Sequence, residues 1–222
     1  MLLGLWQLGR HHDRQEANRT GLERISMPPA ALDELVEGGE ALPYRTVTAR
    51  GEYRPSDEVL IRSQIHLGGA GFHVITPLVQ ADDTAVLVNR GWVPLALDSP
   101  PVAEAEPPPG VVTVTGWIAE TQTRPAFGPT DPESGRLETM SRVDIDRISR
   151  QVPYDLQPVY IVARGETDFL PAPVRPPRFD DAGPHLGYTI QWFGFAVVGL
   201  VGYFFLARKR VRQTRARSST TS

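Results

Sequence analysis

The sequence predicts an α+β protein whose centre is an antiparallel sheet curled into a barrel or sandwich, with short helices at its margins. Six β-rich runs follow one another between residues 44 and 165 and are separated by turn sequences. An uncharged run of 22 residues lies near the C-terminus. The chain has 222 residues and is 41% hydrophobic, which is enough to bury one core of ordinary size. We therefore expect one β-rich domain held at a membrane.

The six strands are expected because each run is rich in β-branched and aromatic residues. The sequences PSD, HLGGA and QADD lie between neighbouring runs and have the turn chemistry of hairpins. The predicted strands cover residues 44–54, 58–65, 71–79, 84–94, 111–120 and 157–165.

Two short helices and two proline-rich segments complete the predicted domain. Residues 28–39 begin with prolines and end with glycines, which is the pattern of a short helix. Residues 141–152 predict a second helix, capped by Ser141. The proline-rich residues 99–110 cannot pair in a sheet and are expected to form an exposed loop. Residues 170–184 are expected to form an extended strap that leads to the membrane.

The uncharged run over residues 186–207 has the length of a helix that crosses a hydrocarbon core of about 30 Å. Aromatic residues lie near both of its ends, and six Arg or Lys residues follow between positions 208 and 217. Such a cluster next to an apolar run indicates a cytoplasmic end and argues against nucleic-acid binding. We expect an extracytoplasmic domain at 11–184, a transmembrane helix at 185–207 and a basic cytoplasmic tail at 208–222.

The N-terminal residues 1–10 contain nine uncharged residues, too few to cross a bilayer, and they lack the features of a signal peptide. We interpret them as the outer end of a first, apparently truncated transmembrane helix, followed by a polar helical exit over residues 11–25. Arginine, alanine and proline are plentiful, which is typical of a GC-rich bacterial genome. The expected location is therefore the bacterial plasma membrane.

Several chemistries are excluded by composition and motifs. The chain has no cysteine, and so no disulfide, thiolate nucleophile or Cys-based metal site. It also lacks the GxSxG, HExxH, P-loop and GxGxxG motifs, and we expect no enzyme active site. The GGAGF sequence after Leu67 is interpreted as a hairpin turn. The four histidines of the body are interpreted as headgroup-level, surface or sheet residues: His11, His12, His66 and His73.

The sequence VNRGW, ending at Trp92, closes an apolar strand with an Asn, an Arg, a Gly and a Trp. Two interpretations remain open. The residues alone favour a β-bulge with Trp92 in the core. The alternative is a bend that presents Arg90 to a ligand or partner.

The residues at the outer end of the predicted membrane helix form one stripe. His185, Tyr188 and Trp192 lie at helical spacing, and Gly187 and Gly194 lie on the opposite face, where a partner helix could approach. A neutral imidazole there could ligate haem iron between flat aromatic rings. The residues alone favour the simpler interpretation, an interfacial aromatic belt.

Three separated stretches resemble one known family: LGLWQLGR near the N-terminus, GFHVITPLV with VLVNRGWVP in the centre, and HLGYTIQWFGFA at the last helix. The chain resembles the SURF1 family over nearly its whole length. That resemblance implies a membrane helix at each end, a β-rich extracytoplasmic domain between them, and a role in the assembly of haem–copper cytochrome c oxidase. Trp6, Gln7 and Arg10 correspond to the motif that closes the family's first helix.

The resemblance also implies a site. The family's proposed haem ligand corresponds to His185, so haem a, bound transiently, is the expected cofactor, with Tyr188 and Trp192 as aromatic neighbours and Arg90 as a propionate or partner contact. The expected partners are the catalytic oxidase subunit, haem a synthase and the lipid bilayer. The alternatives are a scaffold that binds oxidase subunits without haem and an extracytoplasmic enzyme of the cell envelope.

Overall fold

The computed structural model describes residues 2–122, 130–165, 169–177, 179, 194–195, 197–204 and 208, with the backbone alone for residues 2–13. The chain divides into two compact units, Met1–Phe179 and Asp180–Ser222. Described residues 194–195 and 197–204 of the second unit are helical, but the predicted site residues His185, Tyr188 and Trp192 lie outside the described part. Within that part, no helix combines the length and the apolar character needed to cross a membrane.

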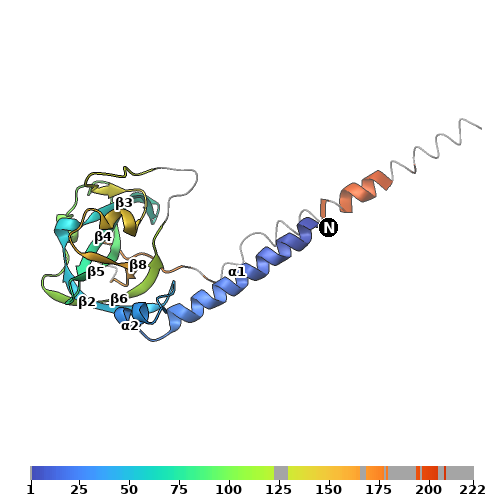
Figure 1. Ribbon diagram of the computed structural model, residues 1–222. Coiled ribbons are helices and arrows are strands. Elements are labelled where there is room, and N and C mark those ends of the chain that lie inside the picture. Colours follow the sequence, from blue (N-terminus) through green and yellow to red (C-terminus); the bar gives the residue numbers. More distant parts are fainter. Residues whose placement is uncertain are drawn as a thin grey trace, which may run out of the picture. The chain divides into compact units, whose positions relative to one another are not determined.

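The first unit begins with one continuous helix, α1, over Leu2–Ser26 (Figure 1). The sequence predicted a membrane-helix end at residues 1–10 and a polar helix at 11–25, and the structure joins both into a single element. Side chains from Arg14 onward are mostly exposed, as expected for a helix that is polar on all sides. We call α1 the stalk helix.

The sheet has eight strands, and all six predicted strands are among them. The two additional strands are pairs of residues that sequence periodicity cannot detect. The strands are β1 (Ala30–Ala31), β2 (Thr46–Tyr53), β3 (Val59–His66), β4 (Gly69–Val79), β5 (Thr84–Pro94), β6 (Val111–Glu120), β7 (Thr139–Met140) and β8 (Asp155–Ala163).

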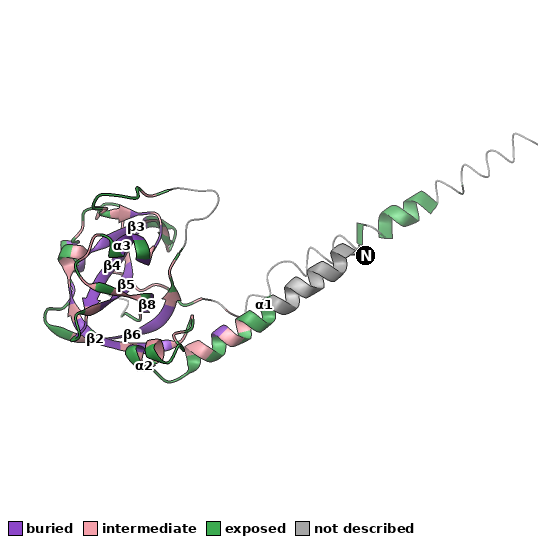
Figure 2. Cartoon of the chain, viewed as in Figure 1, coloured by how far each residue is buried: buried purple, intermediate pink, exposed green. Residues whose placement is uncertain are grey.

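The sheet closes on itself. Its strand order is β1-β2-β6-β8-β5-β4-β3-β7, and an additional pairing of β2 with β4 completes a five-membered ring. The predicted barrel is therefore confirmed, but its strands are not all antiparallel, since β5 and β8 are parallel. An odd ring cannot alternate strand direction throughout, so at least one neighbouring pair must be parallel. Buried residues, purple in Figure 2, lie along the strands of the barrel.

Three apolar clusters lie within the described part of the first unit. The barrel interior contains Leu78, Val88 and Ile161, none of which is measurably exposed. A second cluster packs α3 (Ile145–Ser149) and β7 on the other face of the sheet, with Met140 and Ile148 fully buried. The third cluster lies under the proline-rich loop.

Three local predictions were wrong in part. The helix expected at 28–39 is shorter, because β1 takes its first residues and α2 covers only Leu32–Glu37. The helix expected at 141–152 is reduced to α3, and its cap is the side chain of Asp144, which accepts a hydrogen bond from the backbone N–H of Arg147 at 3.0 Å. Ser141 instead donates its hydroxyl to Asp131 at 2.6 Å.

The loop at 99–110 was expected to be exposed, and this also needs correction. It contains a 3-10 turn, η2 (Ala103–Ala105), and buries Val102 and Ala105 in the third apolar cluster. Proline prevents strand pairing here, but it does not prevent the loop from covering the core.

Candidate functional site

The sequence VNRGW forms a β-bulge, as the residues alone favoured. Along β4 and β5, Val74 faces Gly91 and Ile75 faces Asn89, so Arg90 is the additional residue. Gly91 has φ +142°, and a Cβ atom there would lie 2.4 Å from the carbonyl oxygen of Ala172. Only glycine fits this close backbone approach.

Arg90 points into the structure, and its side chain is only 7% exposed. Its Nη1 atom lies 3.3 Å from Oε2 of Glu58, and its Nη2 donates to the carbonyl oxygen of Ala105. The guanidinium carbon lies 5.4 Å from the ring centre of Tyr53. Burial lowers the pKa of Arg90, and the nearby charge of Glu58 opposes that shift.

Glu58 connects this bulge to the proline-rich loop. Its Oε1 accepts the backbone N–H of Val102 at 2.9 Å, and its Oε2 accepts the hydroxyl of Thr76 at 2.8 Å. The ion pair of Arg90 and Glu58 therefore fixes the loop on the barrel, because each partner bonds to one end of η2. A propionate would have to reach a guanidinium that is 7% exposed and already bonded to Glu58 and Ala105.

Trp92 is half-buried, so its expected place in the core is wrong. Its indole lies over β4, where a Cβ at Gly71 would come within 2.6 Å of Nε1, and one at Gly69 within 3.6 Å of the ring. The imidazole of His66 stacks against it, with ring centres 5.3 Å apart. Two glycines of the GGAGF sequence thus make room for an aromatic side chain, in addition to shaping the turn.

His73 lies opposite Trp92 in the pairing of β4 with β5, and a hydrogen bond to Asn89 holds its imidazole in one tautomer. The Oδ1 atom of Asn89 accepts the backbone N–H of Gly91 at 3.1 Å, which assigns the amide nitrogen of Asn89 as donor to Nδ1 of His73 at 3.2 Å. Burial, and secondarily the charge of His66, lowers the pKa of His73 to about 4. His73 is therefore neutral at physiological pH.

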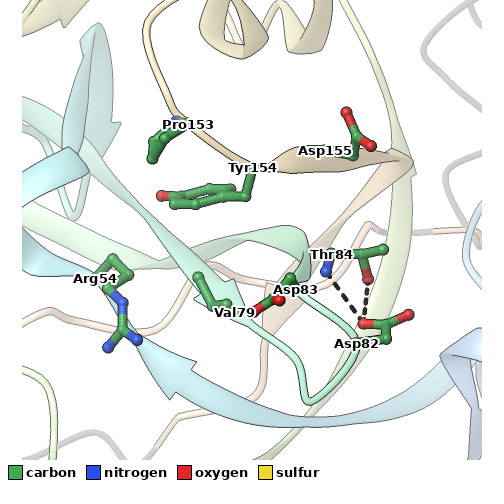
Figure 3. Close-up of a pocket in the computed structure, with 8 residues that line it drawn as sticks. All are labelled: Arg54, Val79, Asp82, Asp83, Thr84, Pro153, Tyr154 and Asp155. Carbon is green, nitrogen blue, oxygen red and sulfur yellow. Dashed lines mark hydrogen bonds between the residues drawn. The ribbon is translucent and has the colours of Figure 1, made fainter.

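A separate cavity of about 490 Å³ lies beside the turn between β4 and β5 (Figure 3). The hydroxyl of Thr84 donates to Asp82 at 2.8 Å, and that bond lowers the pKa of Asp82. The hydroxyl of Tyr154 donates to Asp57 at 3.0 Å, and burial and the Asp57 charge raise the tyrosine pKa.

In the part of the chain that the structure describes, no three His, Asp or Glu side chains are grouped to hold a metal ion. Of the four predicted site residues, only Arg90 lies in that part, and its partners are internal. Sequence reasoning did not identify Glu58 as its partner, because an acidic residue in the turn before a strand carries no signal of burial or pairing. The pairing depends on strands that meet only in the folded barrel.

Comparison with known proteins gives a consistent result. The model of the SURF1 family matches residues 1–197. An uncharacterised SURF1-like protein of Mycobacterium tuberculosis is 27% identical over 222 residues, covering 96% of this chain and 80% of the relative. A SURF1-like protein of Monosiga brevicollis is 28% identical, covering 93% of this chain and 83% of the relative, and one of Rickettsia felis is 24% identical, covering 93% and 91%.

Proposed function

Because the chain belongs to the SURF1 family, we propose that it is a membrane-bound, non-enzymatic assembly factor of haem–copper cytochrome c oxidase. It helps to deliver haem a to the catalytic subunit, and haem a synthase is the expected donor. The observation that carries the proposal is the extent of the family match, which runs from residue 1 through the sequence HLGYTIQWF to residue 197.

The proposed haem site is the stripe at the outer end of the last helix. His185 is the axial ligand, and Tyr188 and Trp192, at i+3 and i+7, flank the macrocycle. A position at the membrane surface suits haem a, because its ring is apolar and its carboxylates are charged. The same sequence pattern supports a plasma-membrane location with the barrel outside the cytoplasm.

Arg90 is not among the haem contacts that we propose. Its side chain is 7% exposed, and the charge partner Glu58 is 1% exposed. Removing the guanidinium from this environment would leave a buried carboxylate without its counter-ion. The partners of Arg90 support a role in holding the proline-rich loop.

The test is to express the chain with haem a synthase and purify it in detergent. We expect an absorption spectrum of haem a in the wild type and its near-complete loss in His185→Ala. The matched control is His66→Ala, since this half-exposed imidazole lies on the barrel and should not ligate iron. Haem a retained by His185→Ala, or lost equally in both variants, would contradict the ligand assignment.

The alternative, a scaffold that binds oxidase subunits without haem, is favoured by one observation on the barrel. Ile65 in β3 and Leu67 in the turn that follows it are large apolar side chains, exposed at 78% and 77%. They lie two residues apart at the turn between β3 and β4, and adjoining exposed apolar side chains are typical of protein contact surfaces. The scaffold predicts that oxidase subunits copurify with His185→Ala and that no variant carries haem a.

A further inference from the structure

The stalk helix has one buried glycine at an otherwise exposed stretch. Gly21 is buried, whereas its neighbours Leu22 and Glu23 are exposed. Glycine inside a helix is about 1 kcal/mol less favourable than alanine. Its presence at position 21 is explained by a neighbour that leaves no room for a side chain. That neighbour is Phe179, whose ring carbon Cε1 would lie 2.2 Å from a Cβ atom at Gly21.

The Phe179 ring also contacts Tyr44. Their ring centres are 5.2 Å apart and the planes are nearly perpendicular, at 84°, which is a favourable edge-to-face arrangement. Tyr44 has φ +67°, a left-handed backbone conformation that is unfavourable for a bulky residue. Its backbone N–H donates to the carbonyl oxygen of Ile118 at 2.8 Å, so the barrel holds this conformation in place.

The stalk helix is itself fixed to the barrel next to this contact. The carbonyl oxygen of Ile25, in the last turn of α1, accepts the hydroxyl of Thr46 at 2.8 Å and the guanidinium of Arg164 at 3.2 Å. A cation at the C-terminal end of a helix also interacts favourably with the helix dipole. Phe179 therefore contacts a helix that cannot turn freely away from β2.

The strap that carries Phe179 is attached to the barrel a few residues earlier. The backbone N–H of Trp92 donates to the carbonyl oxygen of Ala172 at 2.7 Å. In return, the N–H of Ala172 donates to the carbonyl oxygen of Trp92 at 2.8 Å. Val174 packs against the second apolar cluster. The chain is thus held at Ala172, Val174 and Phe179 before it continues toward His185.

We propose that Phe179, seated between Gly21 and Tyr44, is a positioning residue that fixes where the chain leaves the barrel toward His185. The inference rests on the proposed function, because it gives this contact the task of placing the haem ligand. Five residues separate Phe179 from His185, and the six Cα–Cα steps between them reach at most about 22 Å. Without the contact, the free segment would begin at Val174, and the longer tether would place the histidine less precisely.

The first test uses the size of the side chains. Phe179→Ala should lower the haem a retained by the purified protein about two- to tenfold, the range expected for loss of one aromatic contact. Gly21→Leu should do the same by displacing the ring, and the double variant Gly21→Leu with Phe179→Ala should recover haem a. Phe169→Ala is the matched control, because that phenylalanine is 79% exposed. The melting temperature of the barrel should stay within the range of the control.

The second test does not depend on haem. Because the chain has no cysteine, Gly21→Cys with Phe179→Cys can be joined by a short bis-maleimide without competing reactions, whereas Gly21→Cys with Phe169→Cys should not be joined. If the wild type holds no haem a, the proposed function fails, and this crosslink alone decides whether the contact exists. A missing crosslink, or full haem retention in Phe179→Ala, would overturn the inference. A formed crosslink together with recovery in the size-swapped double variant supports it.

Discussion

Replacing Glu58 by alanine should destabilise the barrel more than any surface substitution. Glu58 is 1% exposed and is the acceptor for three groups: the guanidinium of Arg90 at 3.3 Å, the hydroxyl of Thr76 at 2.8 Å and the N–H of Val102 at 2.9 Å. Loss of one partner of a buried ion pair costs about 3–5 kcal/mol, because the remaining charge stays buried. For a domain of this size, that is a decrease in melting temperature of about 6–20 °C.

The assay is thermal and urea unfolding of the detergent-purified chain, with Glu52→Ala as the matched control. Glu52 also forms an ion pair, with Arg54 at 3.1 Å, but their side chains are 47% and 42% exposed. Exposed pairs contribute about 0–1 kcal/mol, so the control should unfold close to the wild type. Adding Arg90→Met to Glu58→Ala should cost less than the sum of the two single substitutions, since no unpaired charge remains.

The reasoning would be refuted by a small effect. If Glu58→Ala and Glu52→Ala reduce the free energy of unfolding by similar amounts, removing Glu58 does not leave a buried, unpaired charge on Arg90. Strict additivity in the double variant would lead to the same conclusion.

Two further predictions concern single side chains. The pKa of His73 is lowered from 6.5 to about 4 in the folded chain, so the unfolded state binds the proton more readily. The contribution of His73 to stability should be complete above about pH 6.5 and should decrease toward pH 4. The free energy of unfolding should fall by at most about 1.4 kcal/mol per pH unit. Urea unfolding between pH 4.5 and 7.5 measures that slope, and an equal slope in His73→Gln would exclude His73 as its source. Asp144→Ala should lower the free energy of unfolding by about 1 kcal/mol, because α3 loses its cap. Helix content is measured by circular dichroism. A decrease in Ser141→Ala but not in Asp144→Ala would show that the cap is misassigned.

The strands were predictable because their signals are local. β-branched runs and the turn sequences between them predicted all six long strands, with boundaries within three residues. The pairs β1 and β7 are too short to leave a periodic pattern, and their pairing depends on which strand lies next to them. The cap at Asp144 was missed for a similar reason. Serine and aspartate are both preferred N-cap residues, and the two are distinguished by bonds that form in the folded chain, from Arg147 to Asp144 and from Ser141 to Asp131.

The bulge at Arg90 shows where local reasoning ends. Asn, Arg, Gly and Trp at the end of a strand predicted an irregularity, and the structure contains one. The sequence could not determine that Arg90 turns inward and Trp92 stays half-buried. The directions of these side chains depend on Glu58, just before β3, and on Gly69 and Gly71 in β4.

The sequence by itself determined the barrel's strands, the absence of thiol chemistry and the resemblance that gives the family, because these depend on residue identity and short-range spacing. Only the tertiary structure decided the parallel pairing of β5 with β8 and the seat of Phe179 between Gly21 and Tyr44. Both are contacts between segments far apart in the chain. They form when closure of an odd ring and burial of apolar side chains bring those segments together.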